Sequence, residues 1–182
     1  ITGVGVDVTI DSLTLQNGSA TNGAGINSST TGTVNINNTV VQSNSASSRG
    51  GGIYLENSTL IVDADSLITG NTAGLRGGGI ENFGADLTVF GTVSGNKANS
   101  GNGGGILAQA GTTIINGGMI SGNTGNSGGG IGIEASANLM VTNSAMITGN
   151  VANFNGGGIF STTGGSVTVS GSTISGNTAN GV

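Results

Sequence analysis

Aliphatic and polar residues alternate in short segments that recur along the whole chain. In each segment two aliphatic residues flank a central one, the pattern of a strand with one buried face, and only Thr113 breaks the aliphatic rule. The segments are Val8-Thr9-Ile10, Val34-Asn35-Ile36, Leu60-Ile61-Val62, Leu87-Thr88-Val89, Thr113-Ile114-Ile115, Leu139-Met140-Val141 and Val167-Thr168-Val169. Their nearly constant spacing predicts seven copies of one structural unit.

Two further patterns repeat with the same period. A glycine-rich triplet stands before an isoleucine at Ile26, Ile53, Ile80, Ile106, Ile131 and Ile159, which lie 27, 27, 26, 25 and 28 residues apart. A second motif, Ile/Val-Ser/Thr-Gly-Asn, ends at Asn71, Asn96, Asn123, Asn150 and Asn177, with a looser copy that ends at Asn44. Each unit therefore contains three short strands and three turns.

These patterns predict an all-β fold, a parallel β-helix of about seven coils with 25–28 residues and three short strands per coil. No stretch has the apolar period of a helix, which excludes helical solenoids, and a propeller blade needs about 40 residues. Coils stacked at about 4.8 Å would form a rod about 34 Å long. We expect residues 1–182 to form one such domain, a fragment or a stackable unit of a larger assembly.

The repeated positions have distinct expected roles. The isoleucines after the glycines should form a buried core ladder, stabilised by contacts between neighbouring coils. The asparagines that end the second motif should stack at one corner, each amide donating to the next and accepting from the previous one.

Composition narrows the possible chemistry. The chain has 39 glycines, no cysteine, no histidine and only 11 charged residues, 8 acidic and 3 basic. Disulfides, cysteine–histidine zinc sites and histidine-dependent catalysis are excluded, and we expect no cofactor. Three cations cannot neutralise many phosphates, so nucleic-acid binding is not expected. No apolar run is long enough for membrane insertion by this segment.

The double motif resembles a known group of proteins. Gly-Gly-Gly-Ile followed by Ile-Ser-Gly-Asn-Thr-Ala is similar to the repeats of polymorphic outer-membrane proteins and of autotransporter-adhesin passengers. The resemblance covers almost the whole chain and implies a right-handed parallel β-helix, which is also the usual hand of parallel crossovers. It further implies an extracellular location, at the surface of a bacterium.

Acidic and basic residues offer few candidate sites. Asp11, Asn37 and Asp63 should share one turn position in successive coils, which makes Asp11 and Asp63 weak candidates for a calcium site. The alternative, that these side chains cap tight turns, is favoured because the column holds only two carboxylates. Arg49 and Arg76 both precede a glycine triplet, so they should lie one coil apart, solvated and paired with Glu56 or Glu81.

Two functions remain open. The first is a non-enzymatic structural or adhesive module that presents its turns to a host-surface protein or glycan. Such a module could also stack end to end with other copies of itself, because terminal coils expose strand edges. The alternative is a polysaccharide lyase or glycoside hydrolase, which would need carboxylates converging on one face.

Overall fold

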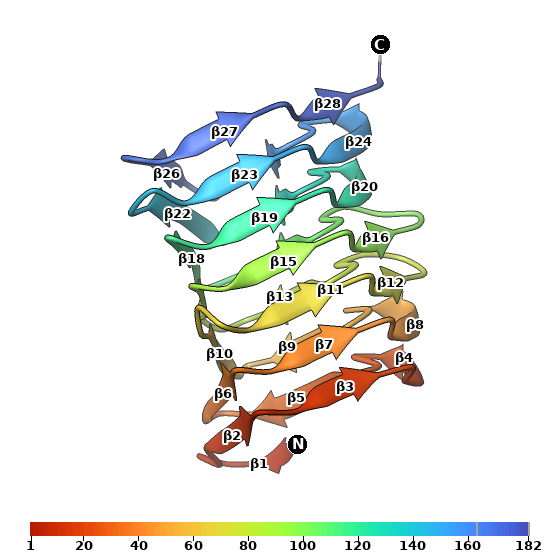
Figure 1. Ribbon diagram of the computed structural model, residues 1–182, viewed down its shortest axis with the longest axis vertical. Coiled ribbons are helices and arrows are strands. Elements are labelled where there is room, and N and C mark those ends of the chain that lie inside the picture. The colour runs from red at the N-terminus through yellow and green to blue at the C-terminus, as the bar shows by residue number, and fades with distance from the viewer. Residues whose placement is uncertain (163, 182) are drawn as a thin grey trace.

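The computed structural model describes residues 1–162 and 164–181. Every regular element in these residues is a β-strand, and the strands form four parallel sheets of seven strands each. The chain visits the four sheets in turn, so each coil contributes one strand to each (Figure 1). The predicted parallel β-helix of about seven coils is confirmed.

Sheet 1 contains the predicted isoleucine ladder. Its strands are β1 (Thr2–Gly3), β5 (Ile26–Thr30), β9 (Ile53–Glu56), β13 (Ile80–Phe83), β17 (Ile106–Ala108), β21 (Ile131–Ile133) and β25 (Ile159–Ser161). Each isoleucine pairs in register with the next, from Ile26 to Ile159. The four interior members of this ladder, from Ile53 to Ile131, are completely buried.

Sheet 2 contains the alternating segments. Its strands are β2 (Val8–Asp11), β6 (Thr33–Asn37), β10 (Thr59–Val62), β14 (Leu87–Val89), β18 (Thr112–Asn116), β22 (Asn138–Thr142) and β26 (Val167–Val169). Outer residues of the middle segments point inward and are buried, as the period-2 pattern predicts. Thr113 occupies one of these inward positions, and its hydroxyl is buried without a hydrogen-bond partner in the described residues.

Sheet 3 contains the strands that lead to the asparagine motif. Its strands are β3 (Thr14–Gln16), β7 (Val40–Gln42), β11 (Leu67–Thr69), β15 (Thr92–Ser94), β19 (Met119–Ser121), β23 (Met146–Thr148) and β27 (Thr173–Ser175). The central residue of each strand points into the core and stacks on its equivalents in the neighbouring coils.

Sheet 4 adds a fourth short strand to the three predicted in each coil. Its strands are β4 (Ser19–Asn22), β8 (Ser45–Arg49), β12 (Thr72–Ala73), β16 (Lys97–Ala98), β20 (Thr124–Ser127), β24 (Val151–Asn155) and β28 (Thr178–Ala179). Several members have only two residues, too few for an alternating pattern to be visible in the sequence.

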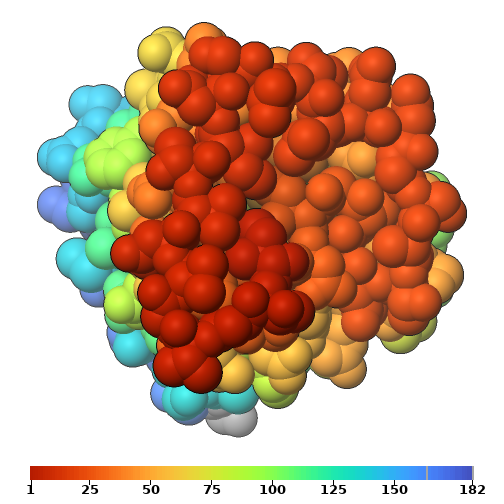
Figure 2. All heavy atoms as spheres, turned by 90° about the horizontal axis from the view of Figure 1, so that it is seen from below, coloured from red at the N-terminus to blue at the C-terminus, as the bar shows by residue number. Residues whose placement is uncertain are grey.

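The coils stack as a right-handed rod. In Figure 1 the near strands of sheet 3 run from left to right, the chain returns behind them, and the coils rise from the N to the C terminus. Seen along the rod from its N-terminal end, the first coils lie over the later ones, whose colours appear mainly at the rim (Figure 2). No helix long and apolar enough to cross a bilayer occurs in residues 1–162 and 164–181.

Glycine is required where the chain bends from sheet 4 into sheet 1. Gly103 begins one triplet with a φ of +69°, a conformation that L side chains rarely adopt. A Cβ on the next residue, Gly104, would lie 2.4 Å from the carbonyl oxygens of Gly129 and Thr124 in the following coil. The triplets therefore permit both a sharp bend and the close stacking of successive coils.

Candidate functional site: a charged corner between sheets 4 and 1

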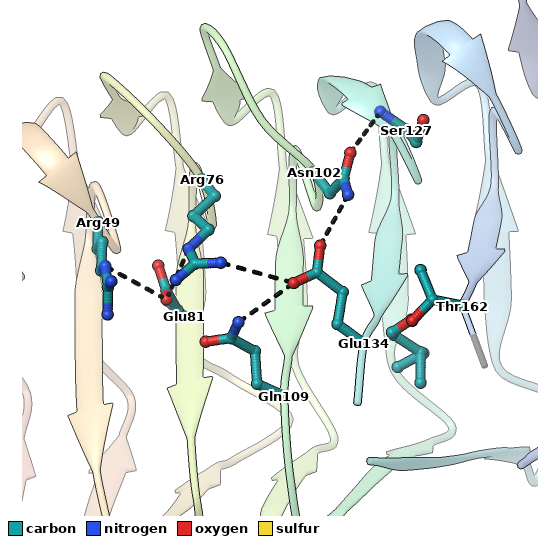
Figure 3. Close-up of polar contacts among 9 residues, drawn as sticks. Arg49, Arg76, Glu81, Asn102, Gln109, Ser127, Glu134 and Thr162 are labelled. Carbon is teal, nitrogen blue, oxygen red and sulfur yellow. Dashed lines mark hydrogen bonds and ion pairs between the residues drawn. The ribbon is translucent and has the colours of Figure 1, made fainter. Parts of the chain in front are cut away.

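Four charged side chains gather where sheet 4 bends into sheet 1. Arg49 ends β8, Arg76 pairs with it one coil later, Glu81 is the second residue of β13, and Glu134 follows β21. We call these four residues the charged corner. Figure 3 shows that the arginines and glutamates converge from different coils, together with Gln109 and Asn102.

Glu81 is fully buried, although it follows the inward-pointing Ile80 and its side chain therefore lies on the outer face of sheet 1. It lies in register between Tyr54 and Leu107, which are 7% and 0% exposed. The backbone before the isoleucine strand passes close over this column, because a Cβ on Gly77 would lie only 2.6 Å from the Cβ of Glu81. The glycine bend therefore covers the outer side of sheet 1 at this point.

The ion pairs link three coils. The Arg76 Nε lies 3.3 Å from the Glu81 Oε1, and the Arg49 Nε lies 4.0 Å from the same oxygen. The Arg76 Nη1 also lies 3.6 Å from the Glu134 Oε2. Arg76 therefore bridges the two carboxylates, while about a third of the Arg49 side chain remains exposed.

Hydrogen bonds extend this network from Glu134 along the rod. The Asn102 Nδ2 donates to the Glu134 Oε1 at 2.7 Å, and the Gln109 Nε2 donates to the Oε2 at 3.1 Å. The Asn102 Oδ1 in turn accepts from the backbone N–H of Ser127 at 3.1 Å. Glu134 is thus held by two hydrogen-bond donors and the Arg76 ion pair, whereas neither oxygen of Glu81 accepts a hydrogen bond from a described residue.

Burial dominates the protonation of Glu81. Loss of hydration raises the pKa of its carboxyl to about 7, although the nearby charges of Arg76 and Arg49 act to lower it and that of Glu134 raises it further. A buried carboxylate without hydrogen-bond donors is costly even beside cations, which accounts for the direction of the shift. Glu81 therefore changes its charge near neutral pH.

The sequence located part of this corner. The predicted alignment of Arg49 with Arg76 is confirmed, and Glu81 is one of the two partners expected for them. The two arginines, expected to be solvated, are partly exposed, whereas the complete burial of their partner Glu81 was not expected. The contribution of Glu134 was missed, since it is separated from Arg76 by 58 positions and no repeated motif marks it.

The asparagines of the second motif form a continuous column of amides. The Nδ2 of each asparagine donates to the Oδ1 of the asparagine one coil later, at 2.9–3.0 Å, from Asn44 through Asn177. The other hydrogen of each Nδ2 is donated to a backbone carbonyl of the preceding coil. The Oδ1 also accepts a hydrogen bond from a backbone N–H. The interior amides thus have every donor and acceptor satisfied.

Asp11 and Asp63 occupy equivalent turn positions but different environments. Asp11 pairs with Asn37 in register, and the backbone N–H of Asp63 donates to the carbonyl of Ile36. The Asp63 carboxylate accepts the backbone N–H of Asn38 and the hydroxyl of Ser66, which is the turn-capping alternative. The described residues contain no group of three or more His, Cys, Asp or Glu that could hold a metal ion.

Catalysis by the charged corner would require substrate to reach its carboxylates. Glu81 is inaccessible at 0% exposure, and Glu134 already accepts hydrogen bonds from Asn102 and Gln109 and pairs with Arg76. The corner is therefore organised as a closed ion-pair network in which the side chains interact with one another.

One segment of the chain matches a known repeat. Residues 38–56, which run from the turn before β7 to the end of β9, match the model of the Chlamydia polymorphic membrane protein repeat. This match and the stacked solenoid fit a bacterial surface β-helix repeat protein of the polymorphic membrane protein or autotransporter-like kind. Comparison with curated proteins and with solved structures gave no match.

Proposed function

We propose that this surface-associated repeat protein acts as a stiff adhesive rod on the outside of a bacterium. The observation that carries the proposal is the matched repeat at residues 38–56, set within an uninterrupted stack of seven coils. A stack of this kind holds its turns at fixed intervals along one axis, so it can present a regular surface to a host protein or glycan. Its role is recognition and spacing, without chemical turnover.

The internal polar ladder supports this role. Interior asparagines such as Asn96 and Asn123 are 1% and 0% exposed and fully hydrogen-bonded, so neighbouring coils are fixed in register. A rod that is rigid in this way resists local opening, which favours survival outside the cell.

Adhesion can be tested with beads that carry the purified chain. We expect beads coated with the folded chain to attach to cultured epithelial cells more than beads coated with the same chain after heat denaturation. The matched control has identical composition and charge, so only the folded surface differs. Equal attachment of the two bead types would overturn the adhesive part of the proposal.

End-to-end association is a second proposal, and the repeating coil surface favours it. Each coil offers its neighbour the same backbone pattern and the same amide column, so a coil of another chain could occupy the next position. Negative-stain electron microscopy across a concentration series would test this idea. Fibres of uniform width that lengthen with concentration are expected, whereas short isolated rods at every concentration would contradict it.

A further inference from the structure

The charged residues of this chain are concentrated in one place. Only 11 of its 182 residues are charged, yet four of them meet in the charged corner. The corner contains both arginines of the chain, and its central carboxylate, Glu81, is completely buried. A structural role in stacking alone does not require a carboxylate there, since Leu107 fills the same register position one coil later.

We propose that Glu81 is a proton-dependent charge switch that holds Arg49 and Arg76 when ionised and releases them when it takes up a proton. The geometry carries the proposal. Both Glu81 oxygens are buried without a hydrogen-bond donor from a described residue, and both arginines reach the same oxygen through their Nε atoms. The Arg49 and Arg76 side chains are 34% and 27% exposed, so water can hydrate their guanidinium groups once the carboxylate is neutral.

The groups that face Glu81 fix the direction of the switch. Arg49 and Arg76 balance Glu81 and Glu134 when all four are charged, so the corner has no net charge. Proton uptake by Glu81 gives the corner a net charge of one positive unit, which the partly exposed arginines carry at the surface.

Strand β9 adds two titratable side chains on the neighbouring coil. Burial, followed by the charge of Glu56, raises the pKa of the Tyr54 hydroxyl, so Tyr54 stays protonated while Glu81 titrates. Glu56 lies on the same strand and pairs in register with Phe83, two residues beyond Glu81. The switch therefore operates through Glu81, in the weakly acidic to neutral range given by its pKa of about 7.

The first test measures the titration directly. Carbon-13 NMR of the side-chain carboxyls, with Glu81→Gln to assign the signal, should give a midpoint near pH 7 for Glu81. The Nε–H signals of Arg49 and Arg76 should shift with the same midpoint, because the two side chains lose their partner together. A Glu81 midpoint near 4.5, or arginine signals that ignore the Glu81 titration, would overturn the proposal.

The second test uses stability. A carboxyl whose folded pKa is raised favours the folded state most at low pH and loses that contribution as pH rises through the folded value. A shift from 4.5 to about 7 corresponds to about a 300-fold change in the folding equilibrium between acidic and alkaline pH. The wild-type chain should lose this factor relative to Glu81→Gln as pH rises from 4 to 8.

Asp65→Asn is the matched control for this comparison, because it removes one negative charge from an exposed turn outside the corner. The difference in stability between Asp65→Asn and wild type should show no comparably large change between pH 4 and pH 8. A flat difference between wild type and Glu81→Gln would contradict the switch. The NMR titration of the wild-type chain decides the question if the Gln variant does not fold.

Discussion

The amide column should be one of the strongest determinants of stability in the rod, and Asn123→Ala tests it. The Asn123 Nδ2 donates to the carbonyl of Val93 at 3.0 Å and to the Asn150 Oδ1 at 2.9 Å. Its Oδ1 accepts from the backbone N–H and the side-chain amide of Asn96, at 2.9 and 3.0 Å. Alanine removes all four hydrogen bonds at a site with 0% exposure.

The magnitude follows from these four contacts. A net contribution of about 1 kcal/mol for each hydrogen bond gives a loss of about 4 kcal/mol in the free energy of unfolding. The backbone N–H of Asn96 and one hydrogen of its Nδ2 would also lose their acceptor in a buried site, which adds a desolvation cost to this loss. A loss of this size is a large fraction of the stability of a typical domain, about 5–15 kcal/mol.

Guanidinium denaturation followed by circular dichroism measures the loss. Ser121→Ala is the matched control, because Ser121 lies two residues earlier on β19 and its side chain makes no hydrogen bond with a described residue, so its effect should stay within about 0.5 kcal/mol. The double variant with Asn96→Ala should lose less than the sum of the single losses, because the two side chains share one hydrogen bond. An Asn123→Ala loss below about 1 kcal/mol would refute the argument that the column stabilises the stack.

Three further substitutions, one of them with a matched glycine control, probe the bends, the core and the turns. Gly104→Ala should prevent close stacking, because its Cβ would lie 2.4 Å from backbone atoms of the next coil. Gly122→Ala is the control: its Cβ would have open space, so it should cost only about 1–2 kcal/mol for the φ of +62°. The denaturant midpoints of the two variants give the comparison. Ile120→Ala removes a fully buried side chain and should cost about 2–5 kcal/mol by the same denaturation assay, a smaller loss indicating that the core collapses around the gap. Asp63→Ala should cost about 1 kcal/mol, because the turn loses the hydrogen bond from the Asn38 backbone to the carboxylate. Millimolar calcium should leave the thermal midpoint of the wild-type chain unchanged, and a calcium-dependent rise would favour a metal site instead.

Most of the architecture could be predicted from the sequence because every coil repeats the same physical constraints. Ile53, Ile80 and Ile106 pair in the register that their spacing of 27 and 26 residues implies. Glycine spacing marked the bends, and asparagine spacing marked the amide column. Such periodic positions can be recognised in the sequence because each one has equivalents in the neighbouring coils.

The fourth strand and the burial of Glu81 could not be predicted in this way. Strands such as Thr72–Ala73 are too short for a hydrophobic pattern, and their pairing depends on the position of the coil before and after. An outward position next to Ile80 would normally face water, but the Gly77 backbone passes close to it and Tyr54 and Leu107 flank it. Burial of this kind depends on how the bend folds over the sheet, which no local pattern encodes.

The contrast between the two polar networks explains how one rod can be both rigid and responsive. In the amide column, uncharged groups satisfy one another completely, so their energy does not depend on pH and they hold every coil in register. In the charged corner, Glu81 is the group left without hydrogen-bond donors, so its interactions change when it gains a proton. Since the amide column runs through the same coils at a different corner, the register of the coils does not depend on the charge of Glu81. The pH dependence should therefore appear in the charge at the surface and in the free energy of unfolding, while the coil geometry stays the same.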